Sequence, residues 1–528
     1  MINSCEKYNV QAFTLDEKVG QLLIVHIQGE TVNDNCRSLI QDTKVGGVIY
    51  YNWSNGLHSP GQVKALSQDL QNLTLINRIS IPLFIATDQE GGVVTRLKKG
   101  FTEFPGNKAI AMAGDLVKAE KVAFIMGKEL LAVGINMNLS PVVDVNINSK
   151  NPVIGVRSFG SDPQTVIDFG KKILQGYKRS NIMTVMKHFP GHGDTVTDSH
   201  EGLPVVNKSL ESLTEVELLP FQKLKLYSDV IMTAHLLVPS LDPDHCSTLS
   251  SKTLTYLRDV IGFQGVIMSD SLVMKGVLKI DQTIDEIAIK ALVAGCDLLL
   301  LGGRELNASD GLELNYKDIK RIHQSVVDAV KHGLILEERV TKSVERILKL
   351  KENYFNQGAV DLLQMDVNGM LSSIDSETLA KEIATDALKI LNLETYNNIN
   401  ISDKNVLIVA PCNLYDRVHE TSIKKIGKKT EMCFFDAFYP SEKEIEEVKI
   451  LSRKVDVLII YSYQAWKNPL QEHLIHSLLN MQKTSILIVT RDENDAELFP
   501  NSNLIIKTYS DSEASLQAVS DKLIAIYS

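Results

Sequence analysis

The chain has 528 residues, of which 44% are hydrophobic and 23% are charged, and its formal net charge is −10. This length predicts two or more domains unless one is a large α/β barrel, and the composition excludes a disordered or collagen-like chain. The acidic balance argues against a nucleic-acid-binding protein, which normally carries a basic excess, and favours small molecules as partners.

Six cysteines are scattered along the chain without a CxxC pair. They indicate neither a disulfide framework nor a structural zinc site, and reduced thiols in the cytoplasm fit them best. The first residues, MINSCEKYNVQAFTLDEKVGQLLIV, contain acidic side chains and no continuous apolar segment, so we expect no signal peptide. No window reaches the length of a membrane span, and we expect neither a membrane nor a nucleic acid as partner.

Eight short apolar segments predict β-strands, and amphipathic helical segments lie between them. The strands are expected at residues 20–27, 45–51, 81–88, 135–142, 182–189, 229–236, 265–270 and 296–303. Near-continuous apolar strands that alternate with helices are typical of a (β/α)8 TIM-type barrel, whose strands are packed inside and covered by helices outside.

Several of these strands end on a polar residue. Asp88, Lys187 with His188, His235 and Asp270 all stand at carboxyl-terminal strand ends. Since the active site of such a barrel lies on this face, we expect these side chains to meet on one rim.

A second pattern begins after the helical segments at 315–353. The stretch NYFNQGAVDLLQMDVNGMLSSID predicts a linker, and SETLAKEIATDALKIL predicts an amphipathic helix. Four further apolar segments alternate with polar helical ones, which indicates a smaller α/β sandwich domain with a largely parallel sheet. These strands are expected at 405–411, 455–462, 484–490 and 503–509.

Three regions follow from these patterns. We expect a barrel catalytic domain over residues 1–360, a linker and bridging helix over 361–400, and the C-terminal domain over 401–528. The C-terminal domain contains no recognisable catalytic motif.

The segment KHFPGHGDTVTDSH, residues 187–200, carries several groups that could do chemistry. Its histidines and aspartates could hold a zinc ion, but they lie on a glycine-containing loop and lack the helical HExxH spacing. Alternatively, Asp198 could fix the tautomer of His200 and stabilise its protonated form, which would give a positioned acid. In a third interpretation these two side chains only bond to each other and to the backbone.

Other segments also allow two interpretations. Asp270, in GVIMSDSLVMKG, could cap a helix or act as nucleophile or general base. Asp88, in ATDQEGGVVTRL with Arg96, could accept hydrogen bonds from a sugar or belong to an ordinary turn. Arg157, in NPVIGVRSFG, lies in a loop where an arginine is usually a surface residue, and Trp53 could line the rim or pack beneath it.

Together these motifs resemble glycoside hydrolase family 3, and within it the two-domain β-N-acetylglucosaminidases of the peptidoglycan-recycling type. The resemblance rests on DQEGG with Arg96, GVRSFG, KHFPGHGDTVTDSH, HCSTLS and GVIMSDSLVMKG, in this order over residues 10–355. It extends more weakly to the C-terminal region, and it implies an enzyme that needs no metal and no cofactor.

The resemblance also implies a role for each motif. Asp270 would be the nucleophile that forms a covalent glycosyl-enzyme intermediate, and His200 would be the acid/base with Asp198 as its partner. The subsite for a terminal N-acetylglucosamine would consist of Asp88, Arg96, Arg157, Lys187 and His188. The implied reaction is exo-hydrolysis, with retained configuration, of N-acetylglucosaminides such as peptidoglycan-derived muropeptides.

Three alternatives stay open from the sequence. Phosphate could replace water as the acceptor, which would make the enzyme a phosphorylase. A metal-dependent hydrolase could use His188, His192 and His200. A barrel that binds sugar without turnover is the third.

Overall fold

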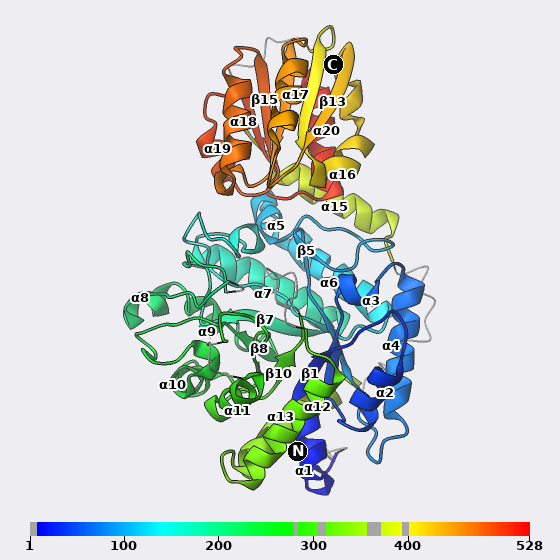
Figure 1. Ribbon diagram of the computed structural model, residues 1–528, viewed down its shortest axis with the longest axis vertical. Coiled ribbons are helices and arrows are strands. Elements are labelled where there is room, and N and C mark those ends of the chain that lie inside the picture. Colours follow the sequence, from blue (N-terminus) through cyan, green and yellow to red (C-terminus); the bar gives the residue numbers. More distant parts are fainter. Residues whose placement is uncertain are drawn as a thin grey trace.

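Two α/β parts are stacked along the longest axis of the molecule, with the amino-terminal part below and the carboxyl-terminal part above (Figure 1). They are seen in a computed structural model that describes residues 8–199, 201–278, 283–303, 313–355, 371–392 and 401–527. Helix α15 (Ile374–Ala387) lies at their junction.

The eight predicted strands of the amino-terminal part are all present and run parallel. They are hydrogen-bonded in the order β10-β1-β2-β3-β6-β7-β8-β9. Met268 at the end of β9 pairs with Leu298 just before β10, which brings the two edges of the sheet together. The (β/α)8 barrel is therefore confirmed. The strands are β1 Leu23–His26, β2 Gly47–Ile49, β3 Phe84–Thr87, β6 Met137–Asn138, β7 Met183–Phe189, β8 Val230–Thr233, β9 Val266–Met268 and β10 Leu299–Leu301.

Helices cover the outside of the barrel, and α7 shows how the sequence specifies them. Asp162 caps its first turn by accepting a hydrogen bond from the Thr165 N–H, Pro163 occupies the first helical position, and Asn181 ends the helix in the left-handed conformation. The helices are α1 Leu15–Gln21, α2 Asp34–Gln41, α3 Asn52–Asn55, α4 Pro60–Thr74, α5 Asn107–Ala113, α6 Leu116–Ala132, α7 Pro163–Ser180, α8 Leu210–Glu215, α9 Leu219–Leu224, α10 Ser251–Thr255, α11 Ile284–Ala294, α12 Tyr316–Lys331 and α13 Glu337–Phe355.

The segment LESLTEVELLPFQKLKLY, residues 210–227, has the pattern of one amphipathic helix, and this expectation is wrong. It forms the two short helices α8 and α9, because Pro220 lacks the N–H that a continuous helix would need at this point. In the part of the chain that is described, no helix has both the length and the apolar character needed to cross a membrane.

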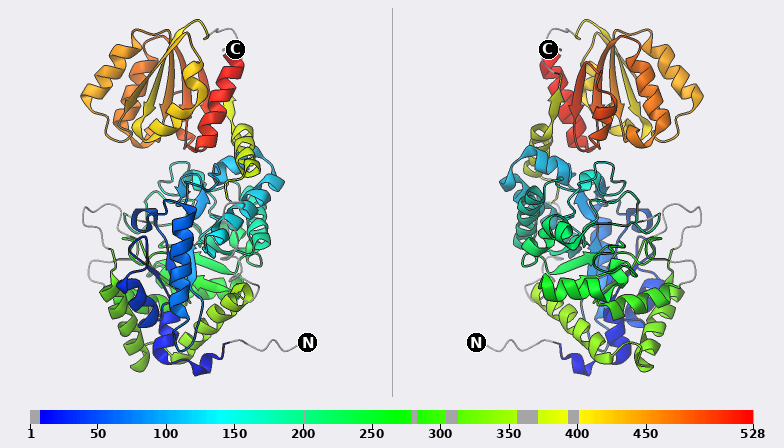
Figure 2. Two further views of the ribbon diagram at one scale, coloured as in Figure 1. Left: turned by 90° about the vertical axis from the view of Figure 1, so that its right-hand side faces the viewer. Right: turned by 90° about the vertical axis from the view of Figure 1, so that its left-hand side faces the viewer.

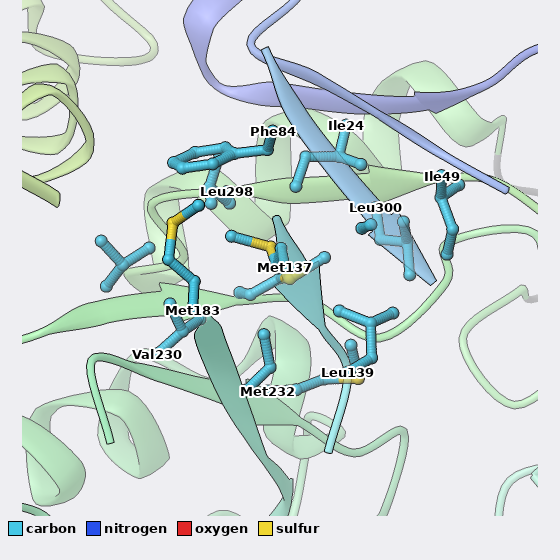
Figure 3. Packing of buried hydrophobic residues seen from close by; sticks show 14 of the residues in the cluster. Ile24, Ile49, Phe84, Met137, Leu139, Met183, Val230, Met232, Leu298 and Leu300 are labelled. Carbon is cyan, nitrogen blue, oxygen red and sulfur yellow. The ribbon is translucent and has the colours of Figure 1, made fainter. Parts of the chain in front are cut away.

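Apolar side chains fill the barrel interior (Figure 3). Strands β1, β3 and β7 are buried along their whole length, because one face points into the barrel and the other lies under helices. Each fully buried side chain of this kind contributes about 1.5–3 kcal/mol to folding. The residues labelled in Figure 3 are Ile24, Ile49, Phe84, Met137, Leu139, Met183, Val230, Met232, Leu298 and Leu300.

The amino-terminal end of the barrel holds a buried lysine. The side-chain amine of Lys351 donates to the Gln21 side chain (2.9 Å) and the Gly46 carbonyl (2.8 Å), and its Nζ lies 4.6 Å from the centre of the Phe84 ring. Burial lowers the pKa of this amine well below its ordinary value.

A buried carboxylate lies at the same end. Asp297 is fully buried and forms ion pairs with Arg258 (2.5 Å), Arg339 (3.3 Å) and Arg346 (3.0 Å). The hydroxyl of Ser343 donates a further hydrogen bond of 2.6 Å. These contacts tie the segment before β10 to helix α13 and to the segment before β9.

The carboxyl-terminal part has a six-stranded sheet in the order β11-β16-β15-β14-β12-β13. Only β11 is antiparallel to its neighbour. Helices lie over both faces of the sheet (Figure 2), and an apolar cluster is buried on each face. The expected α/β sandwich is confirmed. Its strands are β11 Lys389–Leu391, β12 Asn405–Pro411, β13 Lys429–Phe435, β14 Val457–Ser462, β15 Thr484–Val489 and β16 Leu504–Lys507, and its helices are α16 Tyr415–Glu420, α17 Glu442–Ser452, α18 Pro469–Leu479, α19 Asn494–Leu498 and α20 Glu513–Tyr527.

Two strands of this sheet were not expected. Strand β13 lies at an edge and is mostly half-exposed, and β11 was expected to be the end of the helix over 376–391. The expected boundaries at 360/361 and 400/401 touch residues outside the described ranges, so the three-region division stays a proposal.

Candidate active site

A cavity of about 310 Å³ lies at the carboxyl ends of the barrel strands. Its floor includes Leu139, Met232 and Leu300, which belong to the apolar cluster of the barrel interior (Figure 3). Six of the residues expected at the site line it, and they come from five different strand ends or loops. These residues are Asp88, Arg96, Arg157, Lys187, His188 and Asp270.

Lys187 is at the centre of a network of paired charges. Its ammonium lies 2.9 Å from Asp88 Oδ1 and 2.7 Å from Glu90 Oε1. The guanidinium of Arg157 donates to both oxygens of Glu90, at 2.9 and 2.8 Å, and Arg96 lies 3.5 Å from Asp88 Oδ2. Two carboxylates and three cations thus compensate one another beside the cavity.

The charges in this network fix its protonation state. Burial raises the pKa of Asp88 and of Glu90, but the nearby cations outweigh burial, and both pKa values lie below their ordinary range. For Lys187 burial lowers the pKa, and the two carboxylates more than restore it. The network is therefore ionised at neutral pH, and it offers both acceptors and donors to a ligand with many hydroxyls.

His188 is held by a carboxylate that the sequence did not point to. Its Nδ1 lies 2.7 Å from Oδ2 of the fully buried Asp144, and the backbone N–H of His192 donates to the other oxygen at 2.7 Å. The ring of His192 lies 2.9 Å from the Thr195 hydroxyl and 3.1 Å from the Ser199 hydroxyl. Burial lowers the pKa of His192 to about 4, so this ring is neutral.

These contacts bear on the metal interpretation. Both His188 and His192 already have hydrogen-bond partners in the site. Among the described residues, which do not include His200, no group of three His, Cys, Asp or Glu side chains has the arrangement of a metal site.

Asp270 follows β9 and is half-buried at the cavity. The backbone N–H of Ser271 donates to its Oδ1 at 2.7 Å, and the Ser271 hydroxyl donates to the Gly302 carbonyl. His235 was expected on the rim, but it does not line the cavity. It is fully buried, where it donates to the Ser271 carbonyl (2.9 Å) and lies 2.8 Å from the Thr248 hydroxyl, so it supports the segment that carries Asp270.

Two residues of the DSH motif, Asp198 and Ser199, lie near the cavity. Ser199 lines it, and Asp198 is half-buried beside a second cavity. His200 lies outside the described residues, so its pairing with Asp198 is not seen.

Two aromatic side chains complete the wall. Tyr51 and Trp53 stack with ring centres 5.2 Å apart, and the Arg96 guanidinium lies 5.6 Å from the Tyr51 ring centre. Trp53 therefore lines the rim, one of its two expected places. Tyr51, Glu90 and Asp144 were not among the expected site residues.

This fold and site define a barrel enzyme that binds a polar small molecule at the carboxyl ends of its strands. The family model described as glycosyl hydrolase family 3 N terminal domain matches residues 14–350. The chain belongs to glycosyl hydrolase family 3 and is a glycoside hydrolase, which confirms the resemblance found in its motifs.

Individual relatives agree with this assignment. The protein named β-hexosaminidase A from Pseudoalteromonas piscicida is 35% identical over 343 residues, which are 61% of this chain and 55% of that protein. The chain thus spans about half the length of that relative. A β-hexosaminidase from Photobacterium profundum is 34% identical over 296 residues, or 55% of this chain and 85% of that protein.

A solved structure is similar over both parts of the chain. It is a glycoside hydrolase family 3 β-N-acetylglucosaminidase from Paenibacillus sp. str. FPU-7, with a TM-score of 0.87 and 32% sequence identity. The match covers 98% of each chain, so the two-part architecture is common to both.

Proposed function

We propose that this glycoside hydrolase is a retaining, exo-acting β-N-acetylglucosaminidase. Its substrates would be peptidoglycan-derived muropeptides or related glycosides that end in N-acetylglucosamine. The names of the relatives, β-hexosaminidase and β-N-acetylglucosaminidase, support this activity. A cytoplasmic location, favoured by the cysteine content, is part of the proposal.

The observation that carries the proposal is the gathering of Asp270 and the charged network in one cavity. A volume of about 310 Å³ is near the lower end for small-ligand sites, which suits a single terminal sugar. In this assignment the ionised Asp88 accepts hydrogen bonds from sugar hydroxyls, while Arg96, Arg157 and Lys187 donate to sugar oxygens.

The proposed reaction has two steps. The Asp270 carboxylate attacks the anomeric carbon while His200 protonates the leaving oxygen, which gives a covalent glycosyl-enzyme. Neutral His200 then takes a proton from water, the water displaces Asp270, and the sugar leaves with its original configuration. Asp198 would orient His200 and stabilise its protonated form.

The first test is the initial product of para-nitrophenyl N-acetyl-β-glucosaminide cleavage, followed by NMR with and without phosphate. Retention predicts that β-N-acetylglucosamine appears first. The α-anomer would refute the Asp270 intermediate, and a sugar 1-phosphate would identify a phosphorylase. If exhaustive chelation abolished the activity, the metal-dependent alternative would replace the proposal.

A second test separates the acid/base from the binding groups. His200→Gln should reduce kcat by about 100- to 10,000-fold, and less for an aryl leaving group that needs no proton. The activity of the wild-type enzyme should fall above neutral pH as His200 loses its proton. A rate that stays flat from pH 6 to 9 with chemistry rate-limiting would contradict this role.

A further inference from the structure

A second cavity, of about 460 Å³, lies between the barrel and the C-terminal domain. Val94, Val153 and Arg157 line both this cavity and the first one, so the two spaces adjoin. Asp198, the residue proposed to orient the acid/base, also lines the second cavity. A leaving group that departs from the first cavity would lie here.

The C-terminal domain contributes the outer wall through the carboxyl ends of its parallel strands. Asn413, Tyr463, Arg491 and Asp511 follow β12, β14, β15 and β16. Open α/β sheets bind ligands at this edge. The binding edge of the second sheet and the mouth of the barrel therefore enclose one space.

Direct contacts hold the two walls together. Lys467 donates to the Pro152 carbonyl (2.8 Å), and Asn494 donates to the Ser149 carbonyl (2.6 Å). Arg417 pairs with Glu103 at 3.2 Å. The loop over 149–157, which ends at Arg157 of the proposed sugar subsite, is thus fixed by the C-terminal domain.

Arg491 is the notable charge in this cavity. Its Nη1 donates to the Tyr463 hydroxyl at 2.9 Å, and its guanidinium carbon lies 5.5 Å from the centre of the same ring. Within the described part of the chain it forms no ion pair with a carboxylate, and its buried Nε has no hydrogen-bond partner. Burial lowers the pKa of Arg491, but Tyr463, Asp492 and Asp511 together hold it above its ordinary value, although neither carboxylate pairs with the guanidinium directly.

The carboxylates near Arg491 are engaged elsewhere. Asp511 pairs with Arg417 at 3.3 Å, and Asp492 accepts hydrogen bonds from Gln464 (2.7 Å) and Trp466 (3.3 Å). Asp492 and Asp511 favour the charged form of Arg491 without an ion pair, so an anion in direct contact would stabilise the cation further. A planar guanidinium with an unpaired N–H matches a carboxylate in geometry as well as in charge.

We propose that the cavity between the domains binds the leaving group of the substrate, and that Arg491 recognises a carboxylate on that group. This inference rests on the proposed function, because it assigns the sugar that is released to the barrel cavity. Specificity for the leaving group then comes from the C-terminal domain, and specificity for the terminal sugar comes from the barrel.

The test compares substrates that differ only in a carboxylate. One is N,N′-diacetylchitobiose, and the others are its derivatives with a carboxylate on the second sugar, at C1, at C6 or on a carboxyalkyl ether at O3. At least one of the acidic derivatives should exceed the neutral disaccharide in kcat/KM, and R491Q should lower that value about tenfold, mainly through KM. The neutral disaccharide and the aryl glycoside should lose less than about threefold in the same variant.

Controls make each outcome decisive. R491K should restore part of the preference because it keeps the charge, and R453Q, at an exposed site of the same domain, should not change it. The inference would be overturned if R491Q lost equal kcat/KM on neutral and acidic substrates, or if the wild type did not prefer the acidic ones. Continued cleavage of the aryl glycoside would in that case leave the proposed function intact. No cleavage of the aryl glycoside would instead refute the proposed function itself.

Discussion

The two ends of the barrel both bury charge, but they use it differently. At the carboxyl end, Lys187 and Glu90 belong to a network that lines a cavity. At the amino end, Asp297 and Lys351 are enclosed by protein partners and line neither of the two cavities described above. Desolvation is costly at both ends. Only at the carboxyl end, the mouth of the barrel, can a ligand take up part of the hydrogen bonding. We therefore expect changes at the mouth to affect activity, and changes at the amino end to affect stability alone.

The largest effect should come from the mouth. Asp270→Asn removes the proposed nucleophile and should lower kcat about ten-thousandfold or more. The free energy of unfolding should not decrease, because Asp270 is only half-buried and the neutral amide is cheaper to bury. Steady-state kinetics on the aryl glycoside and urea unfolding of the same sample would check both. Normal turnover by D270N would remove Asp270 from the mechanism.

Changes at the amino end of the barrel should show the opposite pattern. Asp297→Asn leaves three arginines with a weaker partner and should destabilise the protein by about 3–5 kcal/mol. Because Asp297 lies at the far end of the barrel from the cavity, kcat and KM of the folded enzyme should stay as they are. Thermal unfolding and kinetics well below the unfolding temperature would measure the two effects. A selective loss of kcat would contradict the division between the ends.

Glu90→Gln should combine both effects. The substitution removes one charge from a buried network and should cost roughly 3 kcal/mol of stability. It should also raise KM, because Arg157 and Lys187 lose the carboxylate that positions them. Asp69→Asn, on helix α4, is a suitable surface control. A stability loss with unchanged KM would mean that Glu90 has only a structural role.

The same network predicts a pH dependence of stability. Arg157 and Lys187 overcome the effect of burial and hold the pKa of Glu90 below its ordinary value of 4.5. Its stabilisation is therefore fully present above pH 4.5 and is lost as the pH falls below that value. The free energy of unfolding of E90Q should fall less steeply with acid than that of the wild type. Parallel curves from pH 5 to 3 would exclude this linkage.

Lys351→Met should have the smallest effect. It replaces a buried amine with an apolar side chain of similar length, so stability at pH 7 should stay within about 1 kcal/mol of the wild type or increase. Because the folded-state pKa of Lys351 is lowered, the wild type becomes more stable as the pH rises toward 10.5. Any advantage of the variant should shrink over that range. Urea unfolding at pH 7 and pH 10 would measure this difference.

The sequence predicted the mouth better than its supporting contacts. Buried parallel strands are apolar on both faces, so they stand out in the sequence and locate Asp88, Lys187 and Asp270 at their ends. The position of a polar residue at the carboxyl end of a strand does not by itself say whether its side chain turns into the cavity. It placed His235 on the rim, although its ring bonds the Ser271 carbonyl in the interior.

The missed features have weaker sequence signals. Asp144 was overlooked because the fourth strand was expected to end at residue 142. A search for polar residues up to two positions beyond each strand end would have found it. Glu90 was inside a quoted motif, but its pairing with Arg157 joins residues 67 positions apart and leaves no local pattern. Strand β13, KTEMCFF, is a half-exposed edge strand and lacks the continuous apolar run of its neighbours.

The loop over 149–157 connects two events that occur in different parts of the molecule. The C-terminal domain fixes it at Ser149 and Pro152, and Arg157 at its other end holds Glu90 in the sugar subsite. Thermodynamic coupling is reciprocal, so if the docked domain favours the sugar-binding form of the loop, sugar must favour docking to the same extent. N-acetylglucosamine in the barrel should therefore protect the C-terminal domain against proteolysis, although it would contact none of the cleaved bonds.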